Sequence, residues 1–125
     1  RGLGDVYKRQ LLYTEEADFS ACRDFYQTLL GQEPYYSWNE GTQDRGAKFR
    51  AGRGTISVLC QAHDRKTGPV IVNLETEDVD QTYQALAATD GIRIVSKPVT
   101  QSYGTRYFAV EDPCGNRINL YHSNH

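Results

Sequence analysis

The chain lacks methionine entirely and has one tryptophan and three cysteines among its 125 residues. The cysteines, Cys22, Cys60 and Cys114, are odd in number and form no CxxC pair, which favours free thiols in a reducing compartment. No apolar run approaches the roughly 18 residues of a membrane helix, and no signal-peptide pattern is present. A net charge of −2 also leaves no basic excess. We therefore expect a cytoplasmic protein with neither nucleic acid nor membrane as a partner.

The first ten residues differ in character from the rest. Residues 5–10 read DVYKRQ, which resembles the translation of an adapter used in DNA sequencing libraries. We therefore expect residues 1–10 to be a non-native leader of a metagenomic read, and residues 11–125 to form a single domain. A native basic leader is the alternative.

The apolar spacing predicts two helices, each beginning after an aspartate and ending at a glycine. Asp18 and Gly31 bracket the first, and Asp78, with Gln81 as its capping-box partner, and Gly91 bracket the second. Strands are predicted at residues 11–14, 35–38, 47–51, 55–60, 70–75, 92–95, 106–110 and 117–121, with a loop at 97–104.

These elements repeat. Asp18 and Asp78 are 60 positions apart, and so are Gly31 and Gly91. Two βαβββ modules, at about residues 11–62 and 70–122, therefore account for the chain. Because one such module leaves a sheet face bare, we expect an α+β fold in which the two modules pair their sheets around a shared concavity. A single ferredoxin-like sandwich would leave two hairpins unexplained.

The last hairpin has a well-defined turn, EDPCGN, at residues 111–116. Asp112 opens it, Pro113 suits its first central position, and Gly115 takes a position that favours positive φ. This segment resembles the C-terminal hairpin of the vicinal-oxygen-chelate superfamily, which includes glyoxalases, bleomycin-resistance proteins and extradiol dioxygenases. Members often read DP-x-GN-x-(apolar)-E-(apolar), where the glutamate is a metal ligand. Here that position holds Asn119.

The resemblance implies four metal-ligand positions, two in each module. Carried over one at a time, they fall on Leu11, Ser57, Ile71 and Asn119. Leucine and isoleucine cannot ligate a metal, and serine and asparagine are weak neutral donors. We therefore expect no metal and no cofactor.

The predicted inward-facing residues are neutral, acidic and aromatic. Strand alternation places Ser57, Asn73, Glu75, Asn119 and Tyr121 toward the concavity. Trp38 is expected to border the opening, with a core or dimer contact as the alternative. Tyr103 and Arg106 resemble an aromatic-Gly-x-Arg turn that many family members carry beside the pocket, although Arg106 would also suit an ion pair with an acidic neighbour. Glu75 is the best candidate for a general base if there is chemistry, and a solvated strand-end carboxylate otherwise.

The leading interpretation is a metal-free small-molecule-binding protein, similar to the bleomycin-resistance branch, which sequesters a planar or cationic compound. The features behind it are the missing ligands, the aromatic rim and the negative charge. One alternative is a divalent-metal-dependent lyase, isomerase or dioxygenase with a non-standard ligand set. Another is a structural or regulatory domain that binds a protein partner. Open sheet edges and the family resemblance predict a homodimer.

Overall fold

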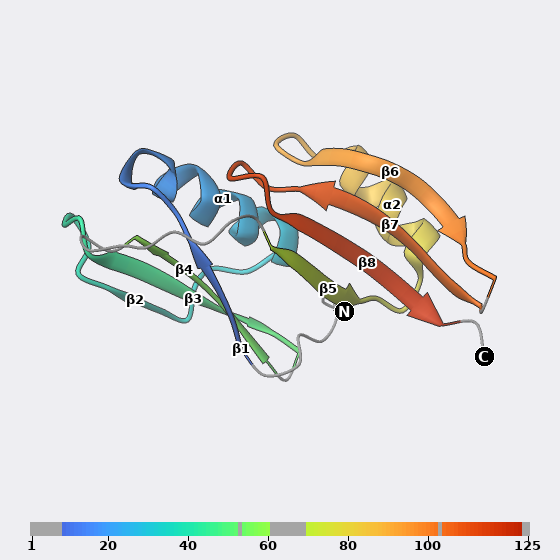
Figure 1. The fold of residues 1–125 in the computed structure, drawn as a ribbon, viewed down its shortest axis with the longest axis horizontal. Helices are drawn as coiled ribbons and strands as arrows, with labels where there is room; N and C mark the ends of the chain where they lie inside the picture. The colour runs from blue at the N-terminus through green and yellow to red at the C-terminus, as the bar shows by residue number, and fades with distance from the viewer. Residues whose placement is uncertain (1–8, 53, 61–69, 103, 124–125) are drawn as a thin grey trace.

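The structure, a computed structural model, describes residues 9–52, 54–60, 70–102 and 104–123. The first module contains β1 (Arg9–Tyr13), the 3-10 turn η1 (Glu16–Asp18), α1 (Phe19–Leu30), β2 (Tyr36–Trp38), β3 (Arg45–Ala51) and β4 (Gly54–Cys60). The second contains β5 (Ile71–Glu75), α2 (Val79–Ala87), β6 (Arg93–Thr100), β7 (Thr105–Glu111) and β8 (Arg117–Ser123). The predicted pair of βαβββ modules is confirmed (Figure 1).

The two sheets have the same topology. Their strand orders are β1-β4-β3-β2 and β5-β8-β7-β6, and in each the first and last strands of the module run parallel. The 60-residue offset extends to the strand register, because Leu11 lies opposite Ser57 and Ile71 lies opposite Arg117. By this register the counterpart of Ser57 in the second module is Arg117.

Several element boundaries differ from those predicted, among them the end of α2, whose C-cap is Ala88 and not the predicted Gly91. β1 starts at Arg9, two residues before the predicted strand. Asp18 makes no side-chain cap bond, because η1 precedes α1 and already turns the backbone. β6 runs through Pro98, where a loop was predicted. Proline is tolerated there because β6 is an edge strand, and its pairing with β7 shifts register near this point.

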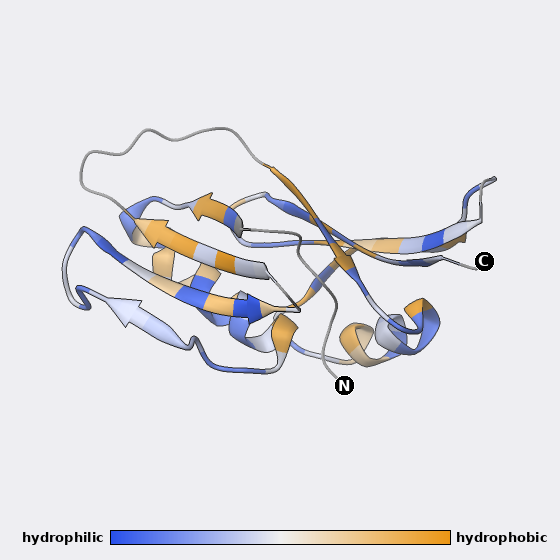
Figure 2. Cartoon of the chain, turned by 90° about the horizontal axis from the view of Figure 1, so that it is seen from below, coloured by the Kyte–Doolittle hydropathy of each residue, from blue (hydrophilic) through white to orange (hydrophobic). Residues whose placement is uncertain are grey.

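Each sheet packs one face against the helix of its own module. On the first sheet Leu12, Phe49 and Val58 are fully buried, and on the second Val72, Phe108 and Ile118 are. Alternate residues therefore point to the opposite, open face of each sheet. Figure 2 shows the first sheet broadside and the second nearly edge-on, so the two open faces point in different directions.

The hydrogen bonds between the modules join α1 to the β7–β8 turn. The buried Asp112 carboxylate accepts from the Tyr26 hydroxyl at 2.6 Å, and from the backbone amides of Cys114 and Asn116 at 2.9 and 2.8 Å. The turn itself has the predicted form, with Gly115 at φ 89°. Cys114 is half-buried, and its Sγ lies 3.1 Å from that of Cys22 on α1, so the turn packs against this helix.

This contact suppresses ionisation of its two proton donors. Burial raises the pKa of the Tyr26 phenol well above its usual value, and the neighbouring Asp112 carboxylate adds to the effect. The hydrogen bond with Cys114, together with burial, raises the pKa of the Cys22 thiol. In the folded chain both groups therefore keep their protons at a pH where the unfolded chain loses them.

Replacing Tyr26 by phenylalanine tests this contact. Because Asp112 loses a donor, we expect Tyr26→Phe to lower the free energy of unfolding by about 1.5 kcal/mol at pH 7, measured by urea denaturation. In the unmodified protein stability should fall as the pH rises above about 10, where unfolded tyrosine ionises. The stability of the Tyr26→Phe variant should fall less steeply over the same pH range. Tyr35→Phe, at an exposed position, is the control, and equal losses in both variants would contradict the prediction.

Candidate small-molecule site

The open face of the second sheet holds a hollow of about 520 Å³. Its lining comes from the second module alone: Ile71, Asn73, Gln101, Thr105, Tyr107, Arg117, Asn119 and Tyr121. The volume falls within the range of small-molecule pockets. The strand register brings these residues together, since Asn73 lies opposite Asn119 and Tyr107 lies opposite Tyr121.

A chain of hydrogen bonds crosses the floor of this hollow. Arg117 Nε donates to Asn119 Oδ1 at 3.0 Å, and Asn119 Nδ2 donates to Asn73 Oδ1 at 3.1 Å. The side chains come from the central strand β8 and from the edge strand β5, which runs parallel to it. Because each amide has a partner, the three side chains hold one another in place across the two strands.

Two predicted residues lie on the first sheet instead. Trp38 stacks on Tyr36 with ring centroids 6.1 Å apart, and its ring covers Gly46, where a Cβ atom would come within 2.2 Å of it. Only glycine leaves room for this packing. Ser57 is 1% exposed, and among the described residues its Oγ has no hydrogen-bond partner.

Trp38 also borders a second, smaller hollow of about 350 Å³ on the first module, beside Phe19 and Arg45. The Arg45 guanidinium lies 4.7 Å above the centre of the Phe19 ring. No residue lines both hollows. Among the described residues, the single chain therefore does not bring Trp38 to Asn73, Asn119 and Tyr121.

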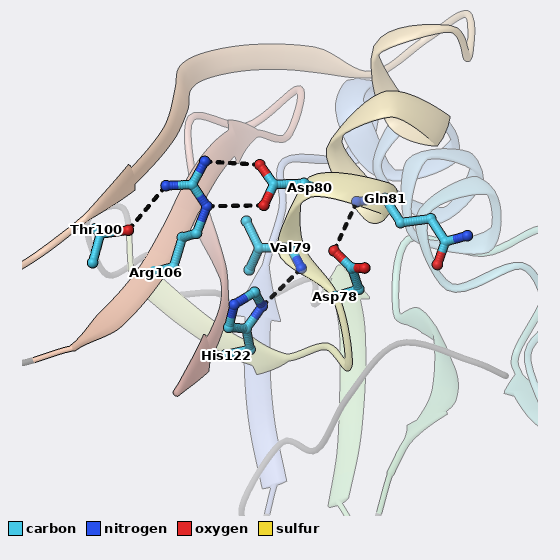
Figure 3. Close-up of polar contacts among 7 residues, drawn as sticks. All are labelled: Asp78, Val79, Asp80, Gln81, Thr100, Arg106 and His122. Atoms are coloured by element: carbon cyan, nitrogen blue, oxygen red, sulfur yellow. Dashed lines mark hydrogen bonds and ion pairs between the residues drawn. The ribbon is translucent and has the colours of Figure 1, made fainter. Parts of the chain in front are cut away.

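Arg106 points to the helix side of the sheet rather than to the open face. Its Nε and Nη2 donate to the Asp80 carboxylate at 2.9 and 2.8 Å, and its Nη1 donates to Thr100 Oγ1 (Figure 3). The hydrogen bond from Arg106 lowers the pKa of Asp80. The predicted ligand contact at Arg106 is therefore replaced by its alternative, an ion pair with an acidic neighbour. Tyr103 lies outside the described residues.

His122 occupies the same helix side, next to this ion pair. Its Nδ1 accepts a hydrogen bond of 2.8 Å from the Val79 amide at the start of α2, where Asp78 also accepts from the Gln81 amide as predicted (Figure 3). Both acceptors satisfy amides that have no partner within the helix. His122 therefore stabilises the helix start and does not reach the hollow.

Glu75 stands at the end of β5, exposed and opposite Tyr121. It is not among the lining residues. The position fits a solvated strand-end carboxylate better than a general base, because the side chain is exposed to water.

The sequence interpretation did not select Arg117, Tyr107, Thr105 and Gln101, which the structure adds to the site. Alternation along residues 117–121 already placed Arg117 on the same face as Asn119 and Tyr121. That alternation was sufficient to predict Arg117 as a residue of the site. For Tyr107 the missing information was the register between β7 and β8.

The four family metal positions do not fit a divalent metal. Leu11 and Ile71 present hydrocarbon and are 40% and 61% exposed. Ser57 is a neutral donor, and the Asn119 amide is already bonded to Arg117 and Asn73. Among the described residues, no group of three or more His, Cys, Asp and Glu side chains is close enough to hold a metal ion.

The family model of the Glyoxalase/Bleomycin resistance protein/Dioxygenase superfamily matches residues 16–120. The chain therefore belongs to this superfamily, which confirms the resemblance seen in the last hairpin. No curated protein matches the chain. None of the described helices is both long and apolar enough to span a membrane.

Solved structures share the fold at low sequence identity. A lactoylglutathione lyase from Agrobacterium tumefaciens has a TM-score of 0.71 at 18% identity, over 94% of this chain and 92% of that one. TioX from Micromonospora sp. ML1 has a TM-score of 0.68 at 17% identity, over 93% of this chain and 98% of that one. A glyoxalase/bleomycin resistance protein from Catenulispora acidiphila DSM 44928 has a TM-score of 0.65 at 23% identity, over 91% of this chain and 96% of that one. At these identities the likeness shows the fold alone.

The donor set leads to a prediction about metal content. We expect purified protein to contain far less than one equivalent of divalent transition metal, measured by mass spectrometry, and chelation to leave its melting temperature unchanged. Asn119→Glu alone should not create a site, because Leu11 and Ile71 still present hydrocarbon. A stoichiometric metal bound on the open face would contradict this prediction.

Proposed function

We propose that the protein binds a planar small molecule, without a metal, on the open face of the second sheet. The observation that carries the proposal is the hollow of about 520 Å³, in which Tyr107 and Tyr121 lie beside a hydrogen-bonded polar floor. Aromatic rings supply contact area for a flat ligand, while a few placed polar groups orient it.

Sequestration, with no bond made or broken, suits this lining better than catalysis. The eight lining residues include no carboxylate, imidazole or thiol. Such groups are the most common general acids and bases, and metal-assisted chemistry needs them as ligands. The alternative, a metal-dependent lyase, isomerase or dioxygenase, requires at least two charged metal ligands, and the described residues supply none in the hollow.

We further propose a homodimer in which a second copy covers the hollow. Each open face exposes large apolar side chains, with Leu11 40%, Tyr36 55% and Ile71 61% exposed. Laying the first sheet of one copy over the second sheet of the other would bury these groups. It would also bring Trp38 of the second copy to Asn73, Asn119 and Tyr121, which one chain alone keeps apart.

Binding of a neutral planar probe, 2-naphthamide, tests the proposed function. Tyr107→Ala and Tyr121→Ala should each weaken its binding about fivefold in calorimetry, because each removes roughly 1 kcal/mol of ring contact. Tyr35→Ala is the control, since Tyr35 is exposed on the first module, where Arg50 covers its ring. Lack of saturable binding, or equal binding in all variants, would count against the site.

The oligomeric state is tested by light scattering at micromolar concentration. We expect a mass near twice 14.2 kDa. Leu11→Glu should shift the protein toward monomer, because a charge on the open face cannot be buried in the interface without a partner. Ala85→Glu on the exposed side of α2 is the control. A monomer mass for the unmodified protein would overturn the proposed assembly.

A further inference from the structure

Arg117 is the single ionised side chain among the eight residues that line the hollow. Its Nε donates to Asn119, which leaves the two terminal nitrogens of the guanidinium for another acceptor. The ion pairs of the described residues join Arg23 to Asp24, Arg45 to Glu16, Arg93 to Glu111 and Arg106 to Asp80. None of them involves Arg117, so among the described residues no carboxylate lies within ion-pair distance of its guanidinium.

The hydrogen bonds on the floor have a fixed polarity. Arginine can only donate, so the Asn119 amide must present its oxygen to Arg117 and its nitrogen to Asn73. Asn73 must then accept through its oxygen, and its own Nδ2 is left as a donor. The floor therefore offers donors at both ends, from Arg117 and from Asn73. Such a surface complements an acceptor, and an anion best of all.

Two acidic groups of this face, Glu111 and Glu75, are not among the residues that line the hollow. Glu111 is opposite Arg117, but its carboxylate pairs with Arg93 on the edge strand, with Nε to Oε1 at 3.5 Å. Glu75 is four residues along β5 from Ile71, the residue opposite Arg117. At about 3.3 Å per residue, the backbone of Glu75 is roughly 13 Å from that of Ile71. A cationic ligand group would have to lie near Glu75, outside the lining of the hollow.

We infer that the site takes a planar compound that carries a carboxylate, which accepts hydrogen bonds from Arg117 and Asn73 while its rings contact Tyr107 and Tyr121. This inference rests on the proposed small-molecule function and names its ligand class. It replaces the cationic ligand that the overall negative charge of the sequence suggested. Net charge describes the whole surface, whereas binding depends on the groups that line the hollow.

Three probes of one shape and different charge separate these possibilities: 2-naphthoate, 2-naphthamide and 2-naphthylmethylammonium. In the unmodified protein, calorimetry should show naphthoate binding about tenfold more tightly than naphthamide, and the ammonium compound most weakly. Arg117→Gln should abolish the preference for naphthoate over naphthamide.

Arg93→Gln is the matched control, because it removes the same charge from the same face at a side chain that is 79% exposed and paired with Glu111. The preference for naphthoate should survive in this variant. Arg117→Lys, which keeps the charge but loses the planar set of guanidinium donors, should retain a reduced preference. It also serves where Arg117→Gln fails to fold, as judged by its melting temperature.

The outcomes distinguish this inference from the proposed function. If all three probes bind equally and Tyr107→Ala weakens them all, the binding site stands and the anionic ligand class is wrong. Tighter binding of the ammonium compound, or an equal loss of preference in the Arg93→Gln control, also overturns the ligand class. If no probe binds to the unmodified protein, the proposed function and this inference fail together.

Discussion

The buried carboxylate of Asp112 is the contact on which the arrangement of the two modules depends. It closes the β7–β8 turn through two backbone amides and holds α1 through the Tyr26 hydroxyl. A buried carboxylate is tolerated only when donors surround it, so the Tyr26 hydroxyl favours packing of the turn against the helix. Because β8 begins at Arg117, five residues later, this contact also sets where the floor of the hollow starts.

The second sheet shows how the fold can support binding without a metal. Asn119 stands where the family motif has a glutamate ligand, and its amide links Arg117 to Asn73. A glutamate would bring a negative charge that has to be balanced by a cation. The asparagine is neutral. It accepts a hydrogen bond from Arg117 through its oxygen and donates one to Asn73 on the next strand through its nitrogen. The position that holds a metal ligand in the family motif therefore holds a hydrogen-bonding amide of the floor in this chain.

The helix-side contact between the modules leaves part of each open face exposed, at Leu11 and Tyr36 on the first sheet and at Ile71 on the second. The first sheet carries Trp38, Tyr36 and the buried Ser57, while the second carries the hollow. Neither set of residues reaches the other within the chain. In the assembly that we propose, the two faces meet only between copies, so the residues predicted to share one site belong to two molecules.

The sequence by itself determined the features that depend on near neighbours. The two-module pattern followed from apolar spacing and from the repeated Asp18/Asp78 and Gly31/Gly91 signals, and the last turn from Asp112, Pro113 and Gly115. These are local preferences of the backbone, so a single stretch of chain is enough to indicate them.

Only the tertiary structure decided what lies opposite what. Arg106 was placed beside the pocket by its motif, yet its register partner is His122 on the helix side, and it pairs with Asp80. Arg117 and Asn73 are 44 positions apart in the sequence, and the parallel pairing of β5 with β8 brings them onto one floor. Alternation along a strand is a local property, but the register between strands is set by hydrogen bonds and core packing between distant segments.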